Sequence, residues 1–515
     1  MKKTNILLLL IFILSIILAS VNIKYPGIYY DEILFGNAAV GGSSTNFIHH
    51  RIFGIPFLLM PYIGALKAYI YFPIFHFFPV DAWSIRIPSI ILGLTGGLLL
   101  VYSIWIWFGR RTAIIAALFT FLDPVLLIHS RLDWGPTSLM FLCRGLLLFG
   151  LSVWWKNQKS IGLWIAIAAT LLGLFDKLNF VWIACSAWLM FVVFFRKNIQ
   201  EYFKRNHCVS LIQGILLVLV LVSFLLRALL VGASLETSSI SSLERTKIGF
   251  NLIYITLIGG GPLDVICGNG TIPSQWMVPA YILAIVSCFP ALVFGLRGFL
   301  WREWLFISCF TALLSLAFLA TKTATGPHHS AVLANLTAIL LVPLLSYPIN
   351  SSNLIVLKGI LFLRTMSVCV LCFAMIFTTL YVIRTLKFPI NSNWDIAHND
   401  LKYLCHKYPN SSFRTGDWGM GTQLIAFSKA KLNINDNWPE FLEPKNKNSD
   451  FFVGGKSKDT ILLLRHKGRE NFPKANANAR YAMENCGFPF QLIKVYNDCY
   501  GKPLIEAWLI QHGNR

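Results

Sequence analysis

Carboxylates are scarce in most of this 515-residue sequence. Asp and Glu number 23 against 44 Lys and Arg, and only eleven of the 23 precede residue 385. The last 131 residues hold the other twelve, and their composition is more polar. A hydrophobic share of 56% and a mean hydropathy of +0.62 exclude an ordinary soluble protein. The sequence therefore predicts a transmembrane domain over 1–384 and a second domain over 385–515.

The net charge of +21 does not indicate nucleic-acid binding, because Lys and Arg fall mostly in short clusters between apolar runs. Such clusters mark the cytoplasmic ends of membrane helices. We therefore predict an integral protein of the cytoplasmic (inner) membrane with no nucleic-acid partner. The basic clusters assigned to the cytoplasmic side are 109–111, 156–159, 196–207, 297–303 and the stretch before Lys358.

Eleven apolar segments are long enough to cross a bilayer as helices. They cover approximately residues 4–23, 85–107, 112–129, 137–155, 160–175, 180–195, 209–231, 276–296, 304–320, 331–348 and 358–384. The first follows Met1-Lys2-Lys3 and is interpreted as a retained helix with a cytoplasmic N-terminus. Cleavage near Ala19-Ser20-Val21 is the alternative.

The apolar stretch 53–79 has a different pattern, because four prolines interrupt it and Lys67 lies in its middle. Its longest proline-free part, 62–72, is too short to span a bilayer. We therefore predict a pair of interfacial helices on the outer surface. This assignment keeps the basic clusters cytoplasmic and gathers the unusual polar loops outside. These outer loops include residues 31–32, 131–135, 176–177, 232–275 and 322–329.

Asp31 and Glu32 form an acidic pair just beyond the first helix, where ionisable residues are commonly functional. They precede residues 33–40, which can start a short helix, so N-terminal capping is the structural alternative. A partly desolvated carboxylate binds protons more tightly and is suited to accept one from a hydroxyl. We therefore predict that this pair is catalytic.

Asp133 lies in the run Arg131-Leu132-Asp133-Trp134-Gly135-Pro136, between two crossings and on the same predicted face. Its structural alternative is the N-cap of a helix that starts near Pro136, with Arg131 as a neutralising neighbour. We predict a functional acid here too. Asp123, which precedes Pro124, lies deeper and equally fits a buried, hydrogen-bonded acid at a proline kink.

Basic side chains also occur on the predicted outer face. Lys177 follows Asp176, and an ion pair or the binding of a phosphate explains it. A later loop brings Lys322, His328 and His329 together, which suits phosphate contact. Lipid head groups are the alternative ligand for these basic groups. Two adjacent histidines are too few for a metal site, so neither a metal nor a cofactor is predicted.

Residues 390–515 alternate apolar runs with helical stretches and turns rich in Gly, Asn and Pro. This pattern predicts a small α/β domain on the outer side of the membrane. Expected strands lie near 460–464, 490–495 and 504–510, and expected helices near 395–407 and 474–485. The stretch 416–421 is interpreted as a strand-to-helix turn, because it matches a nucleotide-binding loop only loosely.

Acids and basic groups at the outer membrane surface suit group transfer from a phosphate-linked lipid. A carboxylate deprotonates an acceptor hydroxyl while cations stabilise the phosphate that leaves. Nucleotide-activated donors are cytoplasmic, so an outer site implies a donor carried by the membrane.

The order of motifs resembles that of the family 39 glycosyltransferases of GT-C fold, which include protein O-mannosyltransferases and lipid A aminoarabinose transferases. The resemblance covers roughly residues 1–384 and is strongest in the first 180. It rests on Tyr30-Asp31-Glu32, the segment 54–67, Arg86-Ile87-Pro88-Ser89, Phe108-Gly109-Arg110-Arg111 and the run 131–136.

By this resemblance, the chain is an inverting glycosyltransferase that moves a sugar from a polyprenyl-phosphate donor to an extracytoplasmic acceptor hydroxyl on a lipid, glycan or protein. Asp31 would be the base that activates the acceptor, Glu32 would position acceptor or donor, and Asp133 would be a second acid in the cavity. The basic residues expected to meet the lipid phosphate are Arg131, Lys177, Lys322, His328 and His329. Expected partners are the donor, membrane lipids and the acceptor.

Two other functions remain as alternatives. A transporter or lipid flippase would place ionisable groups near the bilayer midplane and show related halves. Here the polar residues gather at one predicted face, and no internal repeat is found. An oligosaccharide ligase that uses a lipid-diphosphate donor is not separated from the first function by the sequence. The lipid A aminoarabinose transferases that the chain resembles carry an acidic-Lys-Pro-Pro stretch in the first outer loop. This chain has Gly54-Ile55-Pro56-Phe57-Leu58 instead, which argues against lipid A as the acceptor.

Overall fold

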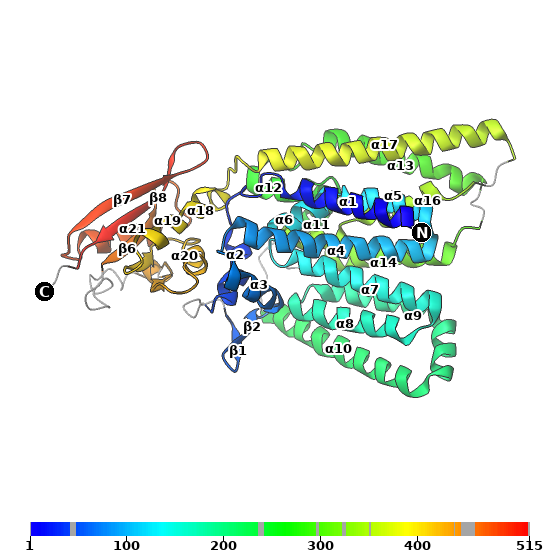
Figure 1. The fold of residues 1–515 in the computed structure, drawn as a ribbon, viewed down its shortest axis with the longest axis horizontal. Helices are drawn as coiled ribbons and strands as arrows, with labels where there is room; N and C mark the ends of the chain where they lie inside the picture. The colour runs from blue at the N-terminus through cyan, green and yellow to red at the C-terminus, as the bar shows by residue number, and fades with distance from the viewer. Residues whose placement is uncertain are drawn as a thin grey trace. The chain divides into compact units, whose positions relative to one another are not determined.

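The structure is a computed structural model in which residues 2–41, 48–234, 241–294, 298–321, 326–349, 352–436, 438–443 and 459–512 are described. The chain divides into two compact units, whose segments can be followed by colour in Figure 1. Unit 1 comprises Met1–Val21 and Ile87–Arg384, and unit 2 comprises Asn22–Arg86 and Thr385–Arg515. The predicted domain 1–384 differs from unit 1 because it also includes residues 22–86.

Unit 1 is built from helices, most of which run side by side (Figure 1). One of them, α4, begins in unit 2 and continues through unit 1. The helices are α1 (Lys2–Ser20), α4 (Ala82–Phe108), α5 (Arg110–Phe121), α6 (Pro124–Leu132), α7 (Thr137–Asn157), α8 (Ser160–Asp176), α9 (Phe180–Arg205), α10 (His207–Ser234), α11 (Ser242–Leu257), α12 (Gly261–Cys267), α13 (Ser274–Phe294), α14 (Trp301–Ala320), α15 (Pro327–Ser330), η1 (Ala331–Leu333), α16 (Leu336–Ser346) and α17 (Leu354–Thr385).

The helices confirm a polytopic membrane protein. Among the described residues, eight helices are long and apolar enough to cross a membrane, or up to ten if each of two bent pairs counts as one span. The bent pairs are α5 with α6, at 51°, and α11 with α12, at 107°. The predicted count of about eleven also includes α1 and α8, which are apolar but shorter. The predicted segments are helical over most of their described length, but 112–129 is divided into α5 and α6, and 331–348 into η1 and α16.

The predicted outer loop 232–275 is wrong over much of its length, because α11 and α12 lie within it. The two helices are joined at a sharp break where Gly259 has a φ of 77°. A Cβ on Gly260 would lie 1.8 Å from the carbonyl oxygen of Gly270, so the bend needs glycine there. With 16 and 7 residues, each helix is too short to be read from the sequence as a membrane crossing.

Close contacts at glycines join α4 to α7 and α7 to α8. A Cβ on Gly145 of α7 would lie 2.3 Å from the carbonyl oxygen of Gly96 on α4. A Cβ on Gly150 of α7 would lie 2.6 Å from the carbonyl oxygen of Gly162 on α8. Small residues at such contacts let helix backbones approach closely, which strengthens packing where water provides no hydrophobic driving force. These glycines therefore set the spacing of three neighbouring helices.

A buried polar network connects α6 and α7 to the chain around Asn335. Asp123 caps the N-terminus of α6, where its Oδ1 accepts a hydrogen bond from the Val125 amide at 2.8 Å. Its Oδ2 accepts from the Asn335 amide at 2.7 Å, and Arg144 of α7 donates to the Asn335 side chain at 2.9 Å. The interpretation of Asp123 as a buried, hydrogen-bonded acid at a proline break is thereby confirmed.

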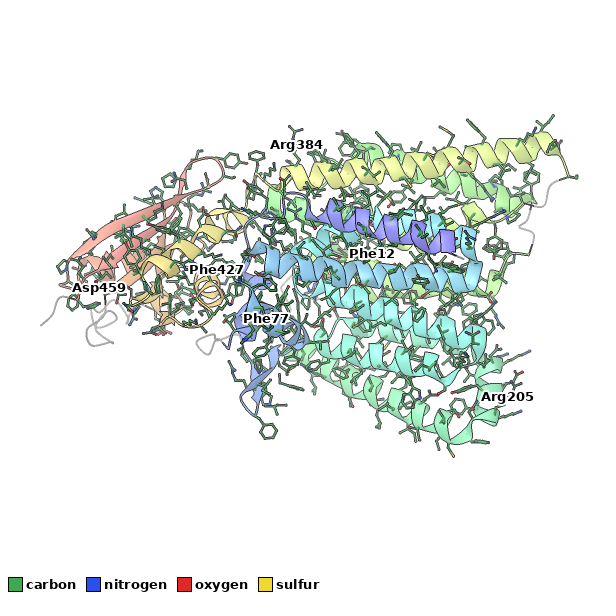
Figure 2. All side chains as sticks on the ribbon, viewed as in Figure 1. Phe12, Phe77, Arg205, Arg384, Phe427 and Asp459 are labelled. Carbon is green, nitrogen blue, oxygen red and sulfur yellow. The ribbon has the colours of Figure 1, made fainter. Side chains whose placement is uncertain are left out.

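The ends of several helices, with the basic residues Lys156 and Arg302, lie together at one end of unit 1. Arg302 lies over the Trp155 ring at 4.0 Å, and the Trp155 indole nitrogen donates to Glu303 at 3.1 Å. In Figure 2, Arg205 lies at one end of the helices and Arg384 at the other. We call the end formed by residues 108–109, 155–157, 302–303 and 347 the basic end.

The predicted helix pair over 53–79 is wrong in its first half, where strands replace a helix. Residues 22–86 of unit 2 contain α2 (Tyr30–Ala39), β1 (His50–Ile52), β2 (Ile55–Met60), β3 (Ile63–Gly64), α3 (Leu66–Phe77) and the start of α4. The strands form an antiparallel sheet in the order β1-β2-β3. Phe53 and Gly54 form the turn, with φ values of 50° and 80° that a two-residue hairpin requires. A Phe-Gly pair lacks the usual Asn-Gly or Asp-Gly signal.

The rest of unit 2 is the expected small α/β domain. Its elements are η2 (Ser392–Trp394), α18 (Ala397–Asp400), α19 (Lys402–Lys407), β4 (Ser412–Thr415), α20 (Gly421–Phe427), β5 (Ile434–Asn435), η3 (Glu440–Leu442), β6 (Thr460–Arg465), α21 (Pro473–Glu484), β7 (Phe490–Asn497) and β8 (Pro503–Ile510). The sheet order is β5-β4-β6-β8-β7, with β4 parallel to β5 and β6 and the other pairs antiparallel. The stretch 416–420 joins β4 to α20 as the predicted strand-to-helix turn.

Strand β6 is the centre of this domain, because both of its faces are buried. Ile461 and Leu463 pack in the core that contains α20 and α2, whereas Leu462 and Leu464 pack in the core that contains α21. A strand covered on both faces reads as a continuous apolar run, which explains why the sequence predicted it well.

Replacing Gly145 with Ala is expected to lower the thermal unfolding temperature in detergent, because the new methyl group must displace the backbone at Gly96. Overpacking of this kind costs roughly 1–3 kcal/mol. Gly359→Ala in α17 is the matched control, since a Cβ there meets nothing within 4 Å. An unfolding temperature of Gly145→Ala equal to that of Gly359→Ala would contradict the close approach of α4 and α7.

Candidate functional site

The acidic pair lies in the first turn of α2, within unit 2. Glu32 is fully buried and accepts hydrogen bonds from Arg86 on both carboxylate oxygens, at 2.6 Å from Nε and 2.8 Å from Nη2. The Arg86 side chain is equally buried and also donates to the carbonyl oxygens of Ile23 and Pro26, at 2.6 and 2.9 Å. Glu32 therefore fixes the chain that leads into α2. Its predicted contact with donor or acceptor stays a prediction.

Asp31 differs from Glu32 because its side chain is partly exposed. Three tyrosines lie within electrostatic reach of its carboxylate. Burial and then the negative charge of Asp31 raise the pKa of the Tyr29 and Tyr62 phenols. Burial, then Asp436 and then Asp31, raise the pKa of Tyr30. The phenols around Asp31 therefore remain protonated hydroxyl groups at neutral pH, beside a carboxylate that can accept a proton.

Asp133 is fully buried in unit 1, between α6 and α7. Its Oδ1 accepts from the Ser138 amide at 2.8 Å and from the Thr137 hydroxyl at 3.2 Å, and its Oδ2 accepts from the Ser89 hydroxyl at 3.1 Å. The predicted N-cap role is not observed as stated, because the N-cap residue of α7 is Pro136 and Asp133 is the C-cap of α6. Asp133 still accepts hydrogen bonds from the first turn of α7, and its catalytic role stays a prediction. A backbone φ of 44° places Asp133 in the left-handed region, where Asp is tolerated better than most residues.

Arg131 is fully buried at the C-terminus of α6. Its Nη1 donates to the carbonyl oxygen of Ala19 at 3.2 Å and also to that of Val21. These carbonyls end α1, where backbone acceptors lack partners within the helix. Arg131 therefore fastens α1 to α6, and its predicted contact with the lipid phosphate stays a prediction.

Lys177 lies between α8 and α9, and its ammonium donates to the carbonyl oxygen of Gly135 at 2.7 Å. A Cβ on Gly135 would lie 3.2 Å from Lys177 Nζ and 3.5 Å from His328 Cδ2. The imidazole of His328 in turn packs on Trp134 at 4.7 Å and on His329 at 4.0 Å. Three predicted phosphate ligands thus converge at the connection between α6 and α7.

His129 is a fourth member of this group, and the sequence analysis gave it no role. The charge of Lys177 acts electrostatically on the imidazoles of His129, His328 and His329. Both ring nitrogens of His129 and the Nδ1 atom of His328 are buried. None of these three atoms has a hydrogen-bond partner among the described residues. We call Lys177, His129, His328 and His329 the basic cluster.

Lys322 lies outside the described residues, so its prediction stays as stated. Across the described part of the chain, no group of three or more His, Cys, Asp or Glu side chains is arranged to hold a metal ion.

Lys67 is a second residue that the sequence analysis did not assign. It is fully buried in α3, with its ammonium 4.8 Å from the centre of the Phe35 ring in α2 and 5.1 Å from that of Tyr71. A cation between aromatic rings joins α3 to the helix that carries Asp31. A lysine within an apolar, proline-rich stretch was the available signal.

The chain is similar in fold to ArnT from Cupriavidus metallidurans, seen in an apo crystal structure and in one bound to undecaprenyl phosphate. The TM-scores are 0.59 and 0.57, the sequence identities are 11% and 13%, and 97% of both chains is covered each time. An oligosaccharyltransferase of Archaeoglobus fulgidus gives a TM-score of 0.49 at 14% identity, over 89% of this chain and 69% of the other. No protein-family model and no curated protein sequence matches the chain.

The likeness to ArnT spans the helices and the C-terminal sheet alike. The chain is therefore an integral membrane protein of GT-C fold with a small C-terminal mixed-sheet domain, as the sequence predicted.

Replacing Glu32 with Ala is expected to reduce the free energy of unfolding by about 3–5 kcal/mol, because Arg86 would be left buried without a counter-charge. Thermal and denaturant unfolding of the purified protein measure the effect. The control is Glu484→Gln, which changes an exposed carboxylate of α21 and should unfold like the wild type. A Glu32→Ala protein as stable as this control would contradict the role of the pair.

Proposed function

We propose that this protein is an inverting glycosyltransferase that moves a sugar from a polyprenyl-phosphate donor to an acceptor hydroxyl. In this proposal the protein lies in the cytoplasmic membrane, and unit 2 faces the extracytoplasmic side. The fold supports the proposal, because it matches ArnT over almost the whole of both chains and one of those ArnT structures holds undecaprenyl phosphate.

The basic cluster is the observation that carries the proposal. Buried polar groups normally have hydrogen-bond partners, and exceptions at one place indicate a missing ligand or water. A phosphate offers acceptor oxygens to the Lys177 ammonium and to imidazole N–H groups, and buried charge-assisted hydrogen bonds of this kind are strong. The cluster therefore suits the phosphate of a polyprenyl-phosphate donor, with Lys322 as a further cation.

The proposed reaction is a single displacement. Asp31 accepts the proton of the acceptor hydroxyl, and the hydroxyl oxygen forms a bond to the anomeric carbon. The bond from that carbon to the phosphate oxygen breaks, and its electron pair leaves with polyprenyl phosphate. The basic cluster stabilises the negative charge that develops on the leaving oxygen. Attack opposite to the leaving phosphate inverts the anomeric centre.

The other predicted site residues support this chemistry in the proposal. Glu32, held by Arg86, sets the position of the neighbouring Asp31. Asp133 organises the turn into α7 that presents Gly135 to Lys177. Arg131 holds α1 against the same turn and adds positive charge near the phosphate.

Replacing Lys177 with Ala is expected to weaken the binding of undecaprenyl phosphate about tenfold or more, since a hydrogen bond from a charged group is lost. Tryptophan fluorescence titration of the purified protein in detergent measures the dissociation constant. Lys156→Ala, which removes an exposed lysine at the basic end, is the control and should bind like the wild type. Unchanged affinity in a folded Lys177→Ala protein would remove the basic cluster from the donor site.

Replacing Asp31 with Asn is expected to reduce sugar transfer by a factor of about 100 or more, because an amide cannot act as the base. The assay follows label from a polyprenyl-phosphate [14C]sugar into envelope material in lipid nanodiscs. Binding of undecaprenyl phosphate should be unchanged. Asp264→Asn, an exposed acid of α12, is the control and should retain transfer.

Normal transfer by the Asp31→Asn protein would exclude Asp31 as the base. A wild-type protein that moves the labelled lipid across vesicle membranes without transferring its sugar would instead support a transporter or flippase. Transfer only from a lipid-diphosphate oligosaccharide would support the ligase alternative.

A further inference from the structure

The segment that leads into α2 is held by residues more than 360 positions away in the sequence. The Gly27 amide donates to the carbonyl oxygen of Trp394 at 2.7 Å. The Ile28 amide donates to Asn399 Oδ1 at 2.8 Å, and Asn399 Nδ2 donates to the Lys24 carbonyl at 3.2 Å. These bonds lie directly before Asp31 and within unit 2.

Aromatic contacts extend the same attachment to the two tyrosines before Asp31. The Tyr29 ring stacks on Trp394 with 4.2 Å between ring centres and an interplanar angle of 10°. The Tyr30 ring lies 4.9 Å from that of Trp418. A Cβ on Gly27 would lie 1.8 Å from the carbonyl oxygen of Asp395. The backbone segments around Gly27 and Asp395 are therefore too close together for any residue other than glycine at position 27.

These contacts replace an ordinary helix cap. The N-cap residue of α2 is Tyr29, which makes no side-chain capping hydrogen bond. Capping side chains normally fix where a helix begins and satisfy its first amides. The start of α2, and with it the position of Asp31, is therefore fixed from outside the helix.

The residues around Trp394 are themselves fixed by Arg465, at the end of β6. Arg465 is fully buried, and its Nη2 donates to Asn393 Oδ1 and to His398 Nε2, each at 2.9 Å. Burial and the Arg465 charge lower the pKa of His398 to about 3, so the ring is neutral at pH 7. Its Nδ1 pairs with the Asp395 carbonyl at 3.0 Å, which leaves Nε2 as the acceptor for Arg465.

Asn393, which accepts a hydrogen bond from Arg465, lies at a distinctive place in the sheet. The parallel strands β4 and β6 end side by side, and the helices that follow them, α20 and α21, cover opposite faces. Open α/β sheets usually bind ligands at such a position. Here Asn393 and Asn471 occupy it, and each donates a hydrogen bond to the other at 2.9 Å. We call residues 391–400, which contain Trp394 and Asn399, the linker. The end of the sheet thus holds this linker where other folds hold a ligand.

We propose that the C-terminal domain positions the catalytic base. Arg465 fixes the linker that contains Trp394 and Asn399, and these two residues hold the segment before Asp31. A catalytic group must be kept within about 0.5 Å of its productive position, and a short, uncapped helix start does not provide this by itself. Trp394, Asn399 and Arg465 are positioning residues in this inference, which rests on the proposed function.

The test compares Asn399→Ala with Asn399→Asp. Alanine removes the acceptor of the Ile28 amide, whereas aspartate keeps an oxygen at Oδ1. We expect kcat to fall about tenfold or more in Asn399→Ala, with the KM for the donor and the affinity for undecaprenyl phosphate unchanged. Asn399→Asp should retain more of the wild-type kcat than Asn399→Ala, because it keeps the acceptor of the Ile28 amide and loses only the hydrogen bond from Asn399 Nδ2 to the Lys24 carbonyl.

The control is Asn478→Ala in α21, which removes a bond of 2.7 Å to the Phe441 carbonyl but does not touch residues 24–31. It should keep the wild-type kcat. Hydrogen–deuterium exchange gives a readout that does not depend on activity: amides of residues 27–33 should exchange faster in Asn399→Ala and not in Asn478→Ala. Wild-type kcat and unchanged exchange in Asn399→Ala would overturn the inference.

The two proposals can fail separately. A wild-type protein that transfers no sugar would refute the proposed function. The exchange measurement would still decide whether the C-terminal domain holds α2. A loss of kcat in Asn478→Ala as large as that in Asn399→Ala would assign the effect to general destabilisation and overturn the positioning role.

Discussion

Removing the Glu32 carboxylate and the Arg86 guanidinium from water costs several kcal/mol for each ion, and close pairing must offset that cost. The pair achieves this with two short hydrogen bonds, and Arg86 donates further to backbone carbonyls of residues 23–27. The chain between α1 and α2 is thereby gathered around one buried cation. Asp31, adjacent to Glu32, takes its position from this arrangement, so the proposed chemistry depends on it.

The proposed reaction assigns different tasks to residues of the two units. Unit 2 holds the acid Asp31, supported by the C-terminal sheet through Trp394 and Asn399. Unit 1 holds the basic cluster, built where α6 meets α7 and where α15 begins. Proton acceptance and stabilisation of a leaving phosphate are the two tasks that glycosyl transfer from a lipid phosphate requires.

Much of the fold follows from the sequence, because apolar length and period are strong local signals. Most of the eleven predicted segments match one helix, and the other two are divided into two helical pieces. The continuous apolar run before Arg465 is a strand buried on both faces. The predictions failed where local chemistry was atypical. The turn at Phe53-Gly54 lacks the usual residues, and the bend at Gly259 divides an apolar stretch into two short helices.

The candidate site was predictable as a set of residue types but not as a set of contacts. Asp31, Asp133 and Lys177 stood out because charge is rare in this part of the chain. The burial of Glu32 against Arg86 could not be read, since the partner is 54 residues away. His129 escaped notice because a lone histidine in an apolar helix has no distinguishing pattern. The contact between Tyr29 and Trp394 depends on tertiary packing alone.

In the proposed function, the basic cluster binds the donor phosphate while Asp31 serves the acceptor. A density map of the protein with a bound polyprenyl-phosphate sugar tests it most directly. The account predicts the phosphate within hydrogen-bonding distance of Lys177 Nζ, with the anomeric carbon open to attack from the side of Asp31. A donor whose phosphate binds at the basic end, beside Lys156, would contradict it.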